Sequence, residues 1–352
     1  MAAIAKTSGG RFFEDFRLDE EIAHATPRML TVGDVALYTA LFGARFAPFA
    51  SDPFARSIGL PRAPIDDLLV FHTVFGKSVP DVSLNAVANL GYAQGRFGAP
   101  VYPGDTISAR STVIGLKENS SRETGVVYVR TTGRNQHREM VLDYVRWVMV
   151  RKRAKDAAVG EERVPELAPF VPADQLLLPP EINGARYDTA LAGAPHCWDD
   201  YAKGERIDHV DGVTVEEAEH MMATRLYHNT ARVHFDGFGA KAGRFGRRLI
   251  YGGHVISLAR ALSFNGLGNA FRLLAINAGR HVNPLFAGDT VFAWSEVLDK
   301  AELPEFPDLG ALRLRLVATK DRPCADFPDK DAAGKPDPSV LLDFDYWALI
   351  RR

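Results

Sequence analysis

The stretch Gly95–Thr106, which reads GRFGAPVYPGDT, is the most informative part of this chain because a closely similar stretch occurs a second time. Its second copy, Gly279–Thr290, reads GRHVNPLFAGDT, and every shared residue is displaced by 184 positions. Collinear similarity at a fixed spacing is the signature of an internal repeat. We therefore interpret the chain as two copies of one structural unit.

The similarity extends well beyond this motif. The spacing of 184 also places Asp52 onto Asp236. Further along, Leu142–Arg151 matches Leu342–Arg351 with a spacing of 200, because the loop Asp321–Ser339 is longer in the second copy. A proline-rich segment without helical or strand periodicity separates the copies. The predicted organisation has three parts, namely an N-terminal repeat over 1–153, a linker on the surface over 154–195 and a C-terminal repeat over 196–352.

Each copy shows the same order of helix and strand patterns. A Thr cap with an acid three residues later occurs at Thr31–Asp34 and again at Thr214–Glu217. A nearly uncharged helix follows, with apolar residues at helical spacing over 68–75 and 255–262, and we expect it to be buried. Alternating segments such as Leu312–Leu316, joined by hairpins, predict antiparallel strands. One buried helix and one sheet per copy predict an α+β fold in which the two sheets pair.

The composition excludes several classes of protein. The chain has 352 residues, 46% hydrophobic and 24% charged, which is typical of a globular protein rather than a disordered one. Lys and Arg number 42 and Asp and Glu 44, and this balance argues against nucleic acid or an anionic membrane as the main partner. Two cysteines, Cys197 and Cys324, the absence of a long apolar stretch and the absence of a signal sequence predict a soluble cytoplasmic protein.

The two copies differ in one stretch that is rich in proton-handling groups. The second copy reads HNTARVHFD over 228–236, whereas the aligned first copy reads ARFAPFASD over 44–52. Asn229 is thus aligned with Arg45, and His234 with Ala50. This asymmetry suggests that the second copy is active and that the first supplies a binding wall. An ordinary, partly buried His234 is the alternative.

A second difference lies where the buried helix begins. The second copy has Gly252 and Gly253 there, and the first copy has Asp66 and Asp67. Glycines at a helix N-terminus let a ligand approach free backbone N–H groups, which suit a developing oxyanion. Carboxylates would repel such a ligand. The alternative is that the glycines only relieve crowding between helix and strand.

Three other signals carry less weight. The glycine-rich segment 237–243 resembles a dinucleotide-binding loop but lacks the surrounding βαβ order. Four residues could be imagined as metal ligands, but their spacing fits no standard site, and we predict no metal. These are His228, His234, Asp236 and His254. No Gly-x-Ser-x-Gly motif occurs, which argues against a serine hydrolase.

The motif of Gly95–Thr106 resembles the signature of MaoC-like hot-dog domains, and the resemblance covers nearly the whole chain twice. It implies a double hot-dog, with two antiparallel sheets each wrapped around a buried helix. The hydratase motif of that family is Asp-x-Asn-Pro-apolar-His, and 229–234 matches it with His234 at the histidine position. Asn229 replaces the acid, Ala231 the Asn and Arg232 the Pro. Within the family, the chain is most similar to the mesaconyl-CoA hydratases, also called β-methylmalyl-CoA dehydratases.

The resemblance implies a hydro-lyase that adds water across a double bond conjugated to a CoA thioester. His234 would act as base toward water and as acid in reverse, and an ordinary pKa near 6.5 would suit both. Asn229 would orient the water or the imidazole, and the N–H groups of Gly252 and Gly253 would hold the thioester oxygen. Mesaconyl groups carry a free carboxylate, for which Arg is a suitable partner. The candidate substrate-binding residues are Arg232, Tyr251, Arg248 and Arg280, of which Arg248 is better explained as a surface or CoA-phosphate contact.

No cofactor is implied, because coenzyme A is part of the substrate. The expected partner is an acyl-CoA, without nucleic acid or membrane, and a homodimer is possible. Two alternatives stay open, namely a hot-dog acyl-CoA thioesterase and a non-catalytic acyl-CoA binding module.

Overall fold

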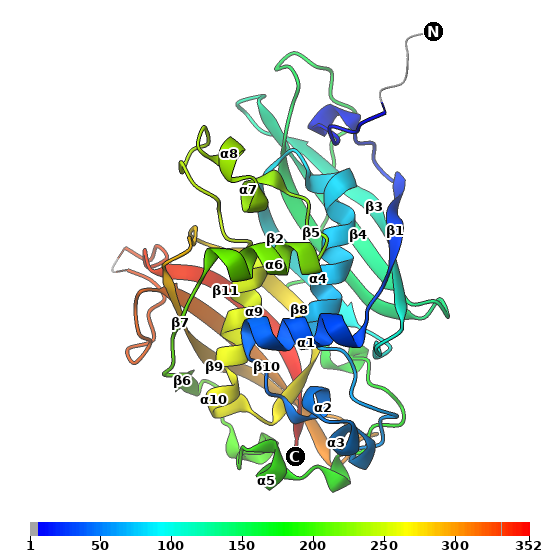
Figure 1. Ribbon diagram of the computed structural model, residues 1–352, viewed down its shortest axis with the longest axis vertical. Coiled ribbons are helices and arrows are strands. Elements are labelled where there is room, and N and C mark those ends of the chain that lie inside the picture. Colours follow the sequence, from blue (N-terminus) through cyan, green and yellow to red (C-terminus); the bar gives the residue numbers. More distant parts are fainter. Residues whose placement is uncertain (1–5, 332) are drawn as a thin grey trace.

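The computed structural model describes residues 6–331 and 333–352. Its strands form one antiparallel sheet in which the order is β1-β3-β4-β5-β2-β8-β11-β10-β9-β6, with β7 paired to β9 (Figure 1). The N-terminal half contributes β1 Glu21–Met29, β2 Ala86–Phe97, β3 Thr106–Glu118, β4 Thr124–Arg134 and β5 Met140–Arg151. The C-terminal half contributes β6 Arg206–Asp208, β7 Val213–Thr214, β8 Ala270–His281, β9 Thr290–Glu302, β10 Leu309–Lys320 and β11 Val340–Arg351.

The helices follow the same order in both halves. The first half has α1 Val32–Phe42, α2 Ala47–Ala50, α3 Asp52–Ser57 and α4 Asp67–Ser78, and α5 Thr189–Ala192 lies between the halves. The second half has α6 Glu217–Leu226, α7 Arg232–Phe235, α8 Gly237–Ala240, α9 Gly252–Leu262 and α10 Phe264–Leu267. This duplicated order confirms the predicted α+β double hot-dog.

Pairing between β2 and β8 joins the two halves. Tyr92 is opposite Gly279 and Arg96 is opposite Ala275, so the predicted sheets form one continuous sheet rather than two separate ones. Figure 1 shows α4 and α9 on the same face of this sheet. Both helices are almost entirely buried, as their lack of charge predicts. They meet where His72 Nε2 lies 2.9 Å from Ser257 Oγ.

The two predicted helix caps have different outcomes. Thr31 caps α1, because its side chain accepts from the N–H of Asp34 while the Asp34 carboxylate accepts from the N–H of Thr31. The predicted cap at Thr214 is wrong. Thr214 lies in β7, where its hydroxyl bonds to that of Thr290 at 2.8 Å, and α6 begins only at Glu217. Strand pairing with β9 satisfies this residue, so it is not available as a cap.

The segment 154–195 has short turns and no long element, as its prolines predict. It does more than lie on the surface. Val171, Ile182 and Tyr187 are buried against β8 and β11 on the side of the sheet away from α9. The indole N–H of Trp347 donates to the carbonyl oxygen of Val171 at 2.9 Å. The segment is therefore part of the core of the second half. No helix in the described part of the chain is both long and apolar enough to span a bilayer.

Candidate active site

The N-terminus of α9 supplies free backbone donors. Tyr251 is the N-cap and Gly252 is the first helical residue. The N–H groups of Gly252 and Gly253 have no acceptor within the helix, because the first turn of an α-helix lacks preceding carbonyl groups. These donors lie at the positive end of the helix dipole. They are therefore suited to bind an oxygen atom that gains negative charge.

Glycine is required here because aromatic rings close over the start of the helix. A Cβ atom on Gly252 would overlap the imidazole of His281. A Cβ atom on Gly253 would overlap the ring of Tyr251 and lie 2.5 Å from the ring of His72. The crowding that the sequence offered as an alternative explanation is thus real. It arises from rings that carry polar nitrogen and oxygen atoms, so the same feature also assembles a polar site.

His234 lies beside this turn and is held in one orientation. Its Nδ1 is 2.9 Å from the carbonyl oxygen of Leu249, which makes Nδ1 the protonated nitrogen. Nε2 then has a free lone pair. The ring centroid of His234 is 5.5 Å from that of Tyr251, the N-cap of α9. The predicted base therefore contacts the residue that immediately precedes the glycine turn.

The electrostatic environment keeps His234 neutral. Burial of the imidazole lowers its pKa to about 4. This corrects the expectation of an ordinary value near 6.5. Because the neutral form dominates at pH 7, Nε2 is ready to accept a proton from water.

Asn229 approaches the same region from the loop between α6 and α7. The residue is buried, and its backbone N–H donates to the carbonyl oxygen of Thr224 at 2.9 Å. Its Oδ1 accepts from the N–H of Ala231 at 3.1 Å. Its Nδ2 is buried and has no acceptor among the described residues. The side chain thus retains one unused donor, which a bound water or substrate oxygen would satisfy.

Three further histidines surround the turn, and sequence analysis missed them. His281 Nε2 lies 3.1 Å from the hydroxyl oxygen of Tyr92, across the junction between the halves. His220 Nε2 accepts the backbone N–H of Tyr251 at 2.8 Å. His72 Nδ1 lies 3.4 Å from the Tyr251 hydroxyl oxygen. Burial lowers the pKa of each, to about 4 for His281, about 3 for His72 and about 2 for His220.

One of these residues had a detectable signal. The spacing of 184 pairs His281 with Phe97 of the first copy, so His281 is another position where only the second copy has a proton-handling group. The structure also moves the sequence pairing of His234 by one residue. Helices α2 and α7 begin 185 residues apart, which pairs His234 with Phe49 rather than Ala50. The contrast between the halves is unchanged, because neither residue ionises.

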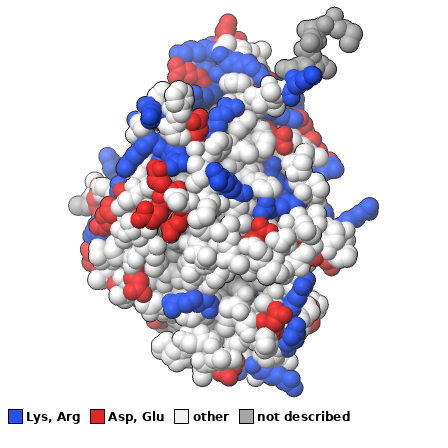
Figure 2. Space-filling model, viewed as in Figure 1, with Lys and Arg blue, Asp and Glu red and all other residues white. Residues whose placement is uncertain are grey.

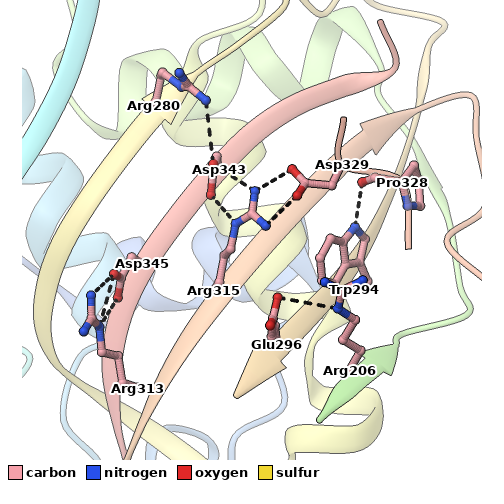
Figure 3. Close-up of polar contacts among 10 residues, drawn as sticks. All are labelled: Arg206, Arg280, Trp294, Glu296, Arg313, Arg315, Pro328, Asp329, Asp343 and Asp345. Atoms are coloured by element: carbon pink, nitrogen blue, oxygen red, sulfur yellow. Dashed lines mark hydrogen bonds and ion pairs between the residues drawn. The ribbon is translucent and has the colours of Figure 1, made fainter. Parts of the chain in front are cut away.

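The structure does not bring the candidate arginines to this cluster. Arg232 is exposed on α7, and Arg248 forms an ion pair with Glu217. Arg280 has a side chain that is 57% exposed, and its guanidinium lies 3.8 Å from Asp343, which also binds Arg315 (Figure 3). Arg280 and His281 are neighbours on a strand, so their side chains leave opposite faces of the sheet. Arg280 therefore faces away from the glycine turn.

The arginine of the repeated motif has a structural role in both halves. On the first half, Arg96 lies 4.0 Å from Asp143, and Arg130 lies 3.0 Å from the same carboxylate. The pairs in Figure 3 repeat this arrangement on the second half. No group of three or more metal-ligating side chains able to hold a metal ion occurs among the described residues.

Comparisons with known proteins give a consistent family. The family model for mesaconyl-CoA hydratase matches residues 2–326. The chain is 64% identical to the β-methylmalyl-CoA dehydratase of Chloroflexus aurantiacus, with 99% of both chains covered. It is 63% identical to the mesaconyl-CoA hydratase of Cereibacter sphaeroides, covering 99% of this chain and 100% of the relative.

Solved structures agree with this assignment. A MaoC domain dehydratase structure from Chloroflexus aurantiacus, whose function is described as putative, superposes with a TM-score of 0.97 at 64% identity, over 99% of both chains. A Mycobacterium tuberculosis protein described as a double hotdog superposes with a TM-score of 0.75 at 25% identity, over 97% of this chain and 98% of that one. The chain therefore belongs to the mesaconyl-CoA hydratase family, within the MaoC-like double hot-dog proteins.

Proposed function

We propose that this protein catalyses the reversible hydration of mesaconyl-CoA to β-methylmalyl-CoA, and that the C-terminal repeat, 196–352, carries the chemistry. Its relatives at 63–64% identity bear the names of this reaction in its two directions. The observation that carries the assignment of residues is the contact of His234 with Tyr251, the N-cap residue that immediately precedes the Gly252–Gly253 turn.

In the hydration direction, Nε2 of His234 takes a proton from water as the oxygen attacks the β-carbon. The electrons of the double bond move toward the thioester, whose oxygen becomes enolate-like and accepts from the N–H groups of Gly252 and Gly253. The His234 imidazolium then gives this proton to the α-carbon, which completes the addition and restores the neutral imidazole. In dehydration, the imidazole removes the α-proton and returns it to the leaving hydroxyl group, which departs as water. Asn229 holds the water with its free Nδ2.

Magnitudes indicate that the glycine turn contributes as much as the histidine. Removing one oxyanion donor typically costs about 2.7–4 kcal/mol of barrier, and a positioned acid or base contributes about 10²- to 10⁴-fold in rate. The buried setting strengthens both effects, because charges that develop there are poorly screened by water. An amide at position 229 cannot exchange protons as a carboxylic acid does, so proton transfer falls to the imidazole.

We assign the N-terminal repeat, 1–153, a scaffold role. In the structure its buried helix has Asp66 in place of Tyr251 and Asp67 in place of Gly252, one residue away from the sequence pairing, and it has Phe49 in place of His234. It nevertheless supports the site, because Tyr92 and His72 of the first half contact His281 and Tyr251 of the second. Both repeats thus contribute residues to the structure of the proposed active site, whereas the proposed proton transfer and oxyanion binding use residues of the C-terminal repeat.

A basic loop supports an acyl-CoA as the ligand. The segment between His234 and Leu249 contains Lys241, Arg244 and Arg247, all exposed. Figure 2 shows basic side chains gathered in the region of α7 and α8, beside acidic ones over the start of α6. Because the loop begins and ends at the site, its charges are placed to bind the phosphates of coenzyme A while the acyl group enters.

We further propose a cytoplasmic location and a homodimeric state. Cys197 and Cys324 are both free thiols, which suits a reducing compartment. Light scattering of the purified full chain would give its oligomeric state.

One experiment separates the proposed function from its two alternatives. The protein is incubated with mesaconyl-CoA while the absorbance of the conjugated thioester and the release of free thiol are followed together. A hydratase removes the absorbance without releasing thiol. Thiol release without a hydrated product would instead establish a thioesterase. Binding with neither change would establish a non-catalytic binding module.

A further inference from the structure

A buried positive charge lies close behind the candidate site without a counter-charge. Arg146 of β5 has no exposed surface. Its guanidinium donates to Ser78 Oγ at 2.8 Å and to Ser83 Oγ at 3.4 Å, and it lies 4.3 Å from the ring centre of Phe75. Its Nε has no acceptor, and no carboxylate of the described residues comes within ion-pair distance. Burying a cation in this way costs several kcal/mol, so its retention calls for a physical reason.

The surroundings of Arg146 connect it to the site. The Phe75 ring on which it stacks has its centre 5.5 Å from that of Tyr251 and 6.3 Å from that of Tyr92. Tyr251 contacts His234, and Tyr92 binds His281. The titratable groups that face Arg146 are the phenols of Tyr92, Tyr144 and Tyr251. Burial raises the pKa of all three, so none of them offers a negative charge at neutral pH.

The duplication provides an internal comparison. The central helices begin 185 residues apart, which pairs Phe75 with Arg260, and the spacing of 200 pairs Arg146 with Tyr346. Each half thus has one buried guanidinium near one aromatic ring. In the first half the arginine is on the strand and the ring on the helix, and in the second half the arginine is on the helix and the ring on the strand. Arg260 lies 5.9 Å from the ring centre of Tyr346 and 3.7 Å from that of Phe46.

The two guanidiniums differ in the groups at the start of the helix near each of them. Asp66 and Asp67, at the start of α4, lie near Arg260, although burial raises the pKa of both carboxyl groups, to about 7 for Asp67. The corresponding positions in the catalytic half are Tyr251 and Gly252. The start of α9 therefore has no carboxyl group at the two positions where the start of α4 has Asp66 and Asp67.

We propose that the free carboxylate of the substrate supplies the counter-charge that Arg146 lacks, and that Arg146 makes the site selective for CoA thioesters of dicarboxylic acids. The inference rests on the proposed function. Tyr92 and His281 contact the carboxylate directly, and Arg146 acts behind them as a positioning charge. In mesaconyl-CoA the carboxylate is bonded to the β-carbon that water attacks, so holding it also places that carbon near His234.

The test compares two saturated ligands that cannot react. 2-Methylsuccinyl-CoA keeps the carboxylate, and 2-methylbutyryl-CoA has a methyl group in its place. Their dissociation constants are measured by calorimetry on the full chain. The variants are Arg146→Met and Arg146→Gln, with Arg260→Met, the paired buried guanidinium of the C-terminal repeat, as the matched control. Circular dichroism shows whether each variant is folded. Because Met and Gln differ in shape and polarity, an effect seen with both replacements of Arg146 can be attributed to the lost charge.

We expect the wild type to prefer the carboxylate ligand. Loss of the Arg146 charge should reduce that preference by about 10- to 100-fold while the affinity for the methyl ligand changes by less than about twofold. Arg260→Met should leave the preference unchanged. If Arg146 had only a structural role, its replacement would weaken the binding of both ligands equally, and that result would overturn the inference. An equal loss of preference for the carboxylate ligand in Arg260→Met would also overturn it. Because the assay needs no turnover, failure of the hydratase assignment is separately visible as absence of mesaconyl-CoA hydration by the wild type.

Discussion

The imidazole of His281 occupies the space that any side chain at Gly252 would need. This contact joins the last residue of β8 to the first residue of α9, and it places the backbone N–H of Gly252 beside a residue that binds Tyr92 of the other half. A glycine at this position therefore serves both the backbone geometry and the assembly of the polar cluster.

Gly252→Ala should reduce kcat strongly. The added methyl group must displace His281 or shift the start of α9, and either change moves the N–H donor from the thioester oxygen. We expect a loss of about 10²- to 10³-fold, in the range for one oxyanion donor. Steady-state hydration of mesaconyl-CoA gives the value. Gly160→Ala is the control, because a Cβ there meets no atom within 4 Å. Activity of Gly252→Ala within about twofold of wild type would contradict the assigned oxyanion site.

Asn229→Asp restores the acid of the usual hydratase motif, and we expect it to impair this enzyme. The unused Nδ2 donor of Asn229 would become an acceptor in a buried position. The loss should be about 10- to 100-fold in kcat at pH 7, because an unpaired buried polar group costs about 1–3 kcal/mol. Comparison with Asn229→Ala separates loss of the donor from introduction of charge. An Asp variant as active as the wild type would show that this position needs only an oxygen atom.

Lowering the pH should destabilise the fold already at pH values above those at which most carboxylates become protonated. The pKa values of His72, His220 and His254 are lowered to about 3, 2 and 3 by burial, below the value of about 6.5 expected in the unfolded chain. The unfolded state therefore binds more protons, and the stability present above pH 6.5 is lost as pH falls toward these native values. Each histidine adds up to about 1.4 kcal/mol per pH unit to the slope.

Urea unfolding between pH 7 and pH 5 measures this slope. His254→Phe removes one of the proton-binding groups and should therefore make the free energy of unfolding depend less steeply on pH. This change in slope is expected whether or not the substitution alters the free energy of unfolding at pH 7. Substitution of the exposed His137 is the matched control. An unchanged slope in His254→Phe would mean that His254 does not stay neutral in the folded protein.

The sequence was sufficient for the fold because the repeated motif is itself structural. Arg96 and Arg280 recur in it because both bind a carboxylate on the outer face of the sheet. The same fact weighs against Arg280 as a substrate-binding candidate, because its guanidinium pairs with Asp343 and faces away from the glycine turn. The strand alternation of Arg280 and His281 could already have indicated this orientation, since two neighbouring residues of a strand cannot both face the helix.

Other parts of the site had no local signal. Asn229 and His234 could be recognised because their segment resembles a known motif and differs between the copies. Arg146 and His72 could not, because their environment depends on helices and strands from both halves packing together. The lowered pKa values of the histidines could not be predicted from the sequence either, since burial of an imidazole is a property of the tertiary structure.

In the proposed mechanism, one imidazole of the second repeat performs the proton transfer. This role is tested with His234→Ala, by following the decrease of enoyl-thioester absorbance with mesaconyl-CoA, and Phe49→Ala of the N-terminal repeat is the counterpart. We predict that His234→Ala lowers kcat by about 10²- to 10⁴-fold with little change in acyl-CoA affinity, whereas Phe49→Ala stays within about threefold of wild type. Turnover by His234→Ala at the wild-type rate would contradict the account.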